Sequence, residues 1–151
     1  EIDLCLRLKN RGYSVAYCPE SVVYHVGGGT LQTGSPFKTL LNFRNNLALI
    51  VKNHHSSPLI PKVLVRMVLD GVKGLEALLK GRFSETAAIL RAHGQFYHRL
   101  PKLLKQRRNE QKARMEPNEN GLYKGSLLWN FFVLKNRQFS QFKPGVPIKD
   151  L

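Results

Sequence analysis

The chain has 151 residues, of which 42% are aliphatic or aromatic, so it can bury a modest core and is not broadly disordered. Its 24 basic and 10 acidic residues give a net charge of +14, which favours a polyanionic partner such as a membrane surface, nucleotide phosphates or nucleic acid. The two cysteines, Cys5 and Cys18, are too few for a disulfide framework and lack metal-site spacing, so we expect two buried thiols.

The chain begins with a helical pattern. Residues 2–11 are predicted to form a helix, with Ile2 facing inward and with Asp3 and Arg7 largely outward. Gly12 suits the left-handed conformation that often ends a helix.

Two strands and a second helix are predicted next. Residues 13–17 alternate apolar with small or polar side chains, and residues 22–26 are rich in β-branched and aromatic side chains, as is typical of strands. A glycine-rich loop follows. Ser35 and Pro36 then indicate a helix start that continues to about residue 52.

The strongest helical pattern covers residues 58–80, whose apolar stripe is expected to pack against the next helix or a catalytic domain. It carries charges in nearly every turn, and a central Lys or Arg costs roughly 2.5–3.5 kcal/mol in a bilayer, which excludes a membrane-spanning helix. Gly81 ends this pattern, Ser84 is predicted to cap a third helix over residues 85–99, and Pro101 is predicted to stop it.

The opening motif indicates an enzyme family. A carboxylate at Glu1 is followed by Asp3-Leu4 and Arg7, and His25 later precedes three glycines. This order resembles the catalytic C-terminal edge of family-2 glycosyltransferases, which are inverting, nucleotide-sugar-dependent enzymes of GT-A fold, and above all their bacterial rhamnosyltransferase-like members. In that family a pair of carboxylates opens the motif, so the resemblance makes Glu1 the second of them and the chain a fragment that starts inside the motif.

The resemblance implies an α+β fold. The expected architecture is the edge of a GT-A α/β domain, with one helix and two short strands, followed by a mainly α-helical C-terminal extension. Three segments are expected: a remnant of the catalytic domain (1–53), a basic amphipathic helical extension (54–116) and an aromatic-containing C-terminal segment (117–151).

The resemblance also assigns roles around the motif. Glu1 is the candidate catalytic base, and the alternative is that it only stabilises a helix end, as acidic residues in a first turn do. Asp3 lies two residues on and cannot share a helix face with Glu1, so a structural role beside the site, paired with Arg7, is expected.

The donor side of the site is expected around the glycine-rich loop. His25 is the candidate ligand of a divalent metal, Mg or Mn, or else a structural residue at a strand end. Gly27, Gly28 and Gly29 could close over the nucleotide diphosphate, although a linker has the same composition. Arg44 could neutralise the departing diphosphate or lie on a solvated helix face.

The resemblance implies an enzyme that transfers a sugar, rhamnose being a candidate, from a nucleotide-diphosphate donor to a glycan or lipid-linked acceptor with inversion. The 151-residue fragment is expected to be inactive by itself. The expected location is cytoplasmic, at the inner face of the cell membrane.

The basic charges leave an alternative function open. Residues 62–114 could bind an anionic membrane, bind nucleic acid or form a merely solvated surface. The aromatics do not interleave with the basic residues and no nucleic-acid recognition motif is present, which argues against nucleic acid. A non-catalytic basic binding module is therefore the alternative to the enzyme.

Overall fold

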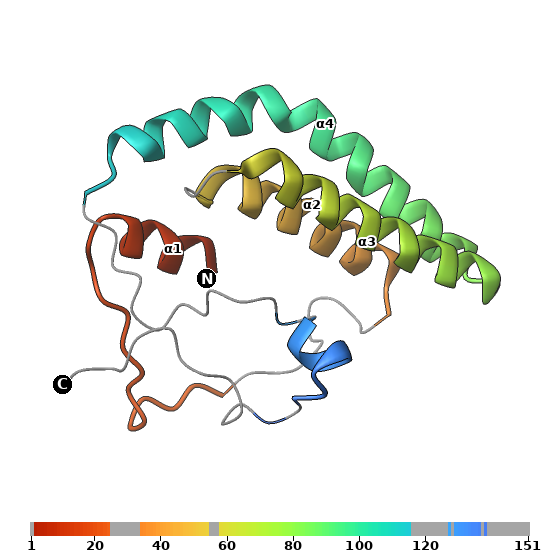
Figure 1. Ribbon diagram of the computed structural model, residues 1–151, viewed down its shortest axis with the longest axis horizontal. Coiled ribbons are helices and arrows are strands. Elements are labelled where there is room, and N and C mark those ends of the chain that lie inside the picture. The colour runs from red at the N-terminus through yellow and green to blue at the C-terminus, as the bar shows by residue number, and fades with distance from the viewer. Residues whose placement is uncertain are drawn as a thin grey trace.

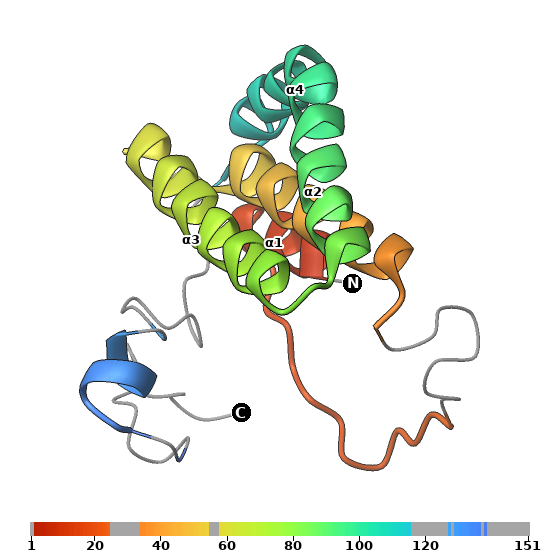
Figure 2. The ribbon, with the colours of Figure 1, turned by 90° about the vertical axis from the view of Figure 1, so that its right-hand side faces the viewer.

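The computed structural model describes residues 2–24, 34–54, 58–115, 127, 129–136 and 138. This part of the chain contains α1 (Ile2–Asn10), α2 (Pro36–Asn53), α3 (Leu59–Leu79), α4 (Phe83–Lys112) and a π-helical turn, η1 (Trp129–Val133). Figure 1 shows that α2, α3 and α4 run back and forth, with α4 arching over the other two. α1 lies below the C-terminal half of α4, and Figure 2 shows the same helices from the side.

The expected α+β fold is wrong, because the described residues form helices and no strand. Two segments were predicted as strands, residues 13–17 and 22–26. Residues 13–17 and 22–24 have no regular secondary structure and no partner strand in the described structure. Their apolar side chains are exposed, with Tyr24 at 96%. Strand propensity reflects packing on a pleated sheet, so the same residues stay irregular where no sheet edge is available to them.

The main core lies between α2 and α4. Leu47 and Val51 of α2 pack against Phe96 and Leu103 of α4, and a second cluster joins Leu40 to the first turns of α4. The two helices lie on either side of the segment boundary expected at residue 53. The division into three segments stays a prediction.

The helix ends follow the sequence in part. Ser35 caps α2 by accepting a hydrogen bond from the Lys38 amide at 3.4 Å, and Gly12 and Gly81 take the positive φ values that end α1 and α3. Ser84 does not cap the last helix, since α4 begins at Phe83.

Pro101 does not stop α4, which continues to Lys112. Proline removes one backbone hydrogen bond from a helix interior. The helix is held on both sides of the proline, because Phe96 before it and Leu103 after it belong to the same core. Tertiary packing therefore outweighs the local break.

Only the inner side of α3 packs. Val63 and Met67 contact the main core, and Gly74 and Ala77 are buried. Most of the apolar stripe is exposed, so α4 does not cover the whole stripe. The alternative, packing against a catalytic domain, stays a prediction. In the described part of the chain, no helix combines the length and apolar character needed to cross a bilayer.

Candidate functional site

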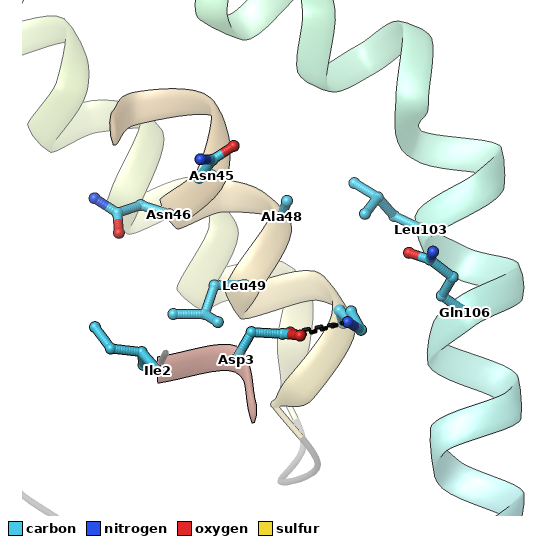
Figure 3. A pocket seen from close by; sticks show the side chains of 9 residues that line it. Ile2, Asp3, Asn45, Asn46, Ala48, Leu49, Leu103 and Gln106 are labelled. Atoms are coloured by element: carbon cyan, nitrogen blue, oxygen red, sulfur yellow. Dashed lines mark hydrogen bonds and ion pairs between the residues drawn. The ribbon is translucent and has the colours of Figure 1, made fainter. Parts of the chain in front are cut away.

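The first turn of α1 borders a pocket of about 500 Å³ between three helices (Figure 3). Ile2 and Asp3 line it from α1, and Leu103 and Gln106 face it from α4. The remaining lining residues lie on α2: Asn45, Asn46, Ala48, Leu49 and Lys52. The volume falls within the range of small-molecule sites, roughly 300–1,000 Å³.

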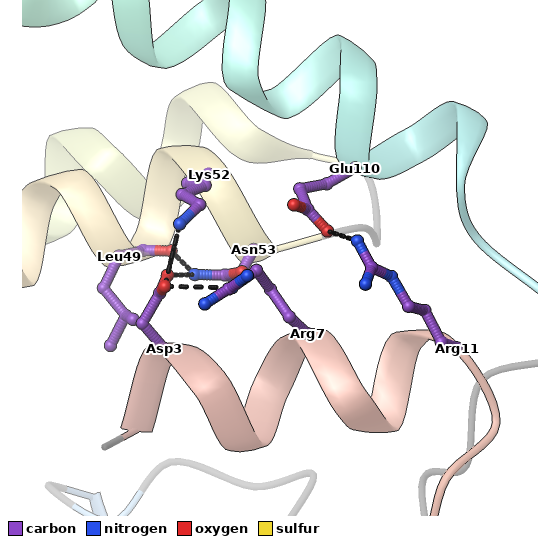
Figure 4. A network of polar contacts seen from close by, with 7 residues as sticks. All are labelled: Asp3, Arg7, Arg11, Leu49, Lys52, Asn53 and Glu110. Carbon is purple, nitrogen blue, oxygen red and sulfur yellow. Dashed lines mark hydrogen bonds and ion pairs between the residues drawn. The ribbon is translucent and has the colours of Figure 1, made fainter.

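Asp3 holds α1 against the end of α2 (Figure 4). Its carboxylate accepts hydrogen bonds from Arg7 Nε at 3.1 Å, from Lys52 Nζ at 2.8 and 2.9 Å, and from Asn53 Nδ2 at 2.7 Å. The expected pairing with Arg7 is present, but Asp3 also contacts α2 and is only partly exposed. A carboxylate with this many donors is placed to position the helix rather than to take up a proton.

The electrostatics of Asp3 favour its ionised form. Partial burial raises the pKa of Asp3, but the hydrogen bonds from Lys52 and Asn53 and the charges of Lys52 and Arg7 outweigh it and hold the pKa below its usual value. Asp3 is therefore a fixed negative charge at the pocket rim at neutral pH.

The other end of α1 is held by α4. Arg11 donates to Glu110 at 3.3 Å (Figure 4), and the Met115 amide donates to the Asn10 carbonyl at 3.2 Å. α1 is thus held to α2 at its N-terminal end and to α4 at its C-terminal end. These contacts fix the orientation of its first turn at the pocket.

The polar lining consists mainly of side-chain amides. Asn45, Asn46 and Gln106 each carry a carbonyl acceptor and an amide donor, so together they can bind the hydroxyl groups of a sugar. Ala48, Leu49 and Leu103 supply apolar walls against which a ring could lie.

Arg44 lies beside this lining but is not part of it. Its guanidinium donates to Asn45 Oδ1 at 3.0 and 3.1 Å and to Gln95 Oε1 at 2.9 Å. Burial first, and the charge of Arg99 second, lower the pKa of Arg44. Its contacts fix Asn45 and join α2 to α4, and the diphosphate contact expected of it stays a prediction.

The remaining predicted site residues lie outside the described residues: Glu1, His25, Gly27, Gly28 and Gly29. Ile2 and Asp3, which follow Glu1 directly, line the pocket. Among the described residues, no group of three or more His, Cys, Asp or Glu side chains could hold a metal ion. The expected divalent metal therefore rests on the resemblance alone.

The prediction for the cysteines can also be compared with the structure. Both cysteines are free thiols, but neither is buried as expected, because Cys5 is half-buried and Cys18 is exposed. His93 bridges α3 and α4 through Asp70, with Nε2 and Oδ2 3.1 Å apart.

The sequence did not identify the amide lining. Asn45 and Asn46 follow Arg44 directly, so they could have been predicted as site residues together with it. Gln106 lies within a run of basic residues, and no sequence pattern marks it as a site residue. Comparison with protein-family models, curated proteins and solved structures finds no match for this chain. The interpretation of the site therefore rests on its geometry and on the opening motif.

Proposed function

We propose that this chain belongs to an enzyme that transfers a sugar from a nucleotide-diphosphate donor to a hydroxyl group of a glycan or lipid-linked acceptor, with inversion. One observation carries the proposal: the helix with the glycosyltransferase-like motif begins at a pocket whose polar lining includes three side-chain amides, beside Asp3 and Lys52. In this proposal the pocket holds the acceptor, and Asn45, Asn46 and Gln106 bind its hydroxyl groups.

The proposed reaction needs one proton acceptor beside the acceptor hydroxyl. Glu1 takes the proton as the hydroxyl oxygen attacks the anomeric carbon of the donor, and the bond from that carbon to the diphosphate oxygen breaks. The electron pair leaves with the nucleotide diphosphate, and attack from the opposite face inverts the anomeric carbon. Asp3 does not compete for this role, because its carboxylate is occupied by Arg7, Lys52 and Asn53.

The donor side of the proposal depends on residues outside the described ones. His25 and the three glycines are assigned to the nucleotide diphosphate by the resemblance. The described residues do not bring a metal-ligand set together, and the proposed divalent metal, Mg or Mn, is assigned to His25 by the resemblance. The proposed location is the cytoplasm, peripheral at the inner face of the cell membrane, where lipid-linked acceptors are accessible.

A saccharide titration followed by NMR tests the acceptor pocket. The unbound 151-residue chain is titrated with rhamnose, glucose and N-acetylglucosamine at millimolar concentration. We expect the side-chain amide signals of Asn45, Asn46 and Gln106 to shift with at least one sugar, and Gln106→Ala to weaken the binding at least tenfold. A net hydrogen bond of about 1.4 kcal/mol corresponds to that factor.

Gln111→Ala is the matched control, because Gln111 lies on the same helix, is exposed and does not line the pocket. Its affinity for the sugar should equal that of the unaltered chain. If none of the three sugars moves the pocket amides, or if both variants lose binding equally, the acceptor assignment is wrong.

A further inference from the structure

α3 presents a broad apolar surface away from the helices that it packs against. Its exposed large apolar residues include Ile60 at 71%, Val68 at 66% and Leu79 at 79%. The outer face of α3 is defined here by these nine residues: Ile60, Leu64, Val65, Val68, Leu69, Val72, Leu75, Leu78 and Leu79.

The outer face is continuous. At 3.6 residues per turn, its nine side chains cover roughly half of the helix circumference, and none of the charged residues of α3 projects from the middle of that half. The opposite side carries the buried contacts of Met67, Gly74 and Ala77. Phe83, exposed at the first position of α4, lies four residues after Leu79 across the tight turn that joins α3 to α4.

Basic residues border the outer face along one edge. Lys62, Lys73 and Lys80 recur on the same side of the helix, between the outer face and the packed side. Lys73 and Lys80 both bind Glu76, at 2.8 and 2.6 Å, which leaves a net positive charge along this edge. Lysine stems can lie along an apolar surface while the ammonium groups reach toward phosphate.

A bilayer surface fits this combination better than a protein does. Protein interfaces are depleted in lysine, whereas interfacial helices combine a wide apolar face with Lys or Arg at its border. The net charge of +14 complements an anionic membrane in particular.

We propose that α3 lies in the plane of an anionic membrane, with its outer face inserted at the boundary of headgroups and acyl chains and Lys62, Lys73 and Lys80 at the level of the lipid phosphates. The surface is built from other residues than the acceptor pocket, so this proposal does not depend on the proposed transferase activity. Insertion differs from a purely electrostatic contact, since part of the binding remains on neutral vesicles and at high salt.

Vesicle co-sedimentation tests the proposal. The 151-residue chain is mixed with neutral phosphatidylcholine vesicles and with vesicles that also contain phosphatidylglycerol. Leu64→Gln, Val68→Gln and Leu75→Gln together should weaken binding to both kinds of vesicle about a hundredfold or more, because inserting each of these side chains stabilises the bound state. Lys62→Gln with Lys80→Gln should weaken binding to anionic vesicles alone, by about fivefold per lysine.

The matched control replaces three exposed valines outside α3: Val15→Gln, Val22→Gln and Val23→Gln. This control should bind both vesicles as the unaltered chain does. Circular dichroism melting checks that each variant folds. If the triple variant does not fold, the single substitutions Val68→Gln and Leu75→Gln replace it, and each should lower the affinity for vesicles about tenfold.

Three outcomes would overturn the proposal. One is equal binding of the α3 triple variant and the valine control. Another is a complete loss of binding when phosphatidylglycerol is omitted, since charge alone would then hold the chain. The third is that the chain self-associates in sedimentation, and that the α3 triple variant abolishes this association without changing vesicle binding. The outer face would then be a contact between two copies of the chain.

Discussion

Asp3 is the residue through which α1 is held to α2. Its carboxylate binds Arg7 on its own helix and Lys52 and Asn53 on α2. The contact with Arg7 has the four-residue spacing of a helical ion pair and could be predicted from the sequence. Lys52 and Asn53 lie 49 and 50 residues away, so no local pattern could reveal them.

Acid should release α1 from α2. Because the pKa of Asp3 is lowered in the folded chain, its contribution to stability is complete above its ordinary pKa of about 3.9 and is lost as the pH falls through the lowered value. Hydrogen exchange of the α1 amides should therefore accelerate in this acidic range. The gain is on the order of 1 kcal/mol, because Asp3 is more than a third exposed and its charges are screened.

Asp3→Asn is the control for this pH effect. The variant should exchange faster at neutral pH, and its α1 amides should lose the additional acceleration at acid pH. If the α1 amides of the unaltered chain and of the variant exchange with the same dependence on acid, then Asp3 does not hold the helix.

At the scale of elements, Arg107 links α4 to the end of α2. Its Nη1 donates to the Val51 carbonyl at 2.9 Å and also to the His54 carbonyl. Arg107 therefore caps the C-terminal end of α2, where backbone carbonyls lack partners within the helix. Burial lowers the pKa of Arg107. The sequence had placed Arg107 in a basic surface, and only its distance from α2 in space shows the other role.

Arg107→Met should lower the free energy of unfolding by about 1.5–3 kcal/mol, the range for hydrogen bonds that involve a charged group. Urea unfolding measures it. Arg108→Met is the matched control, because Arg108 is the neighbouring residue and is exposed, and it should change stability by no more than about 0.5 kcal/mol. Equal losses in the two variants would remove the capping role from Arg107.

The helices of the described structure differ in how far the sequence predicts them. α2 and α3 have both a periodic apolar pattern and recognisable ends, and their observed bounds differ from the predicted ones by one residue or so at each end. The two expected strands had only a short local pattern or composition, and a strand also needs a neighbouring strand to supply hydrogen bonds. The length of α4 depends on core contacts on both sides of Pro101, which only the fold provides.

The same distinction applies to the candidate site. The motif predicted a site at the start of α1 and at Arg44. The pocket is lined by the start of α1, whereas Arg44 lies beside it. Gln106 and Lys52 complete the lining because α4 and α2 meet there, and this meeting follows from the long-range packing of Leu47 against Phe96. Sequence patterns could locate the motif helix but not the surfaces opposite it.

At the scale of the whole molecule, α3 is held by a narrow inner side while half of its circumference faces outward. Buried apolar contacts along this side are few and small, such as Gly74 and Ala77. Asp70, only 1% exposed, adds an ion pair with Arg66 at 2.8 Å and the contact with His93 of α4. Arg66 also lies over the Phe43 ring of α2, 5.4 Å from its centre. The carboxylate of Asp70 is thus the polar centre that joins three helices.

Asp70→Asn should loosen α3 from the other helices. The neutral amide leaves Arg66 without its ionic partner, although Arg66 and His93 are partly exposed and can turn toward water. The loss should therefore be about 2 kcal/mol in urea unfolding, below the 3–5 kcal/mol typical of breaking a fully buried pair. Native-state hydrogen exchange should show the α3 amides opening before those of α2 and α4.

Glu76→Gln is the matched control, since Glu76 lies on the same helix and its carboxylate also binds basic side chains, Lys73 and Lys80, but at the surface. It should leave the unfolding midpoint and the exchange of α3 nearly unchanged, because exposed ion pairs contribute little. If Asp70→Asn and Glu76→Gln have the same effect, then the inner apolar contacts hold α3 without the buried carboxylate. If only Asp70→Asn opens α3, the orientation of its outer face is set by the contacts of the Asp70 carboxylate with Arg66 and His93.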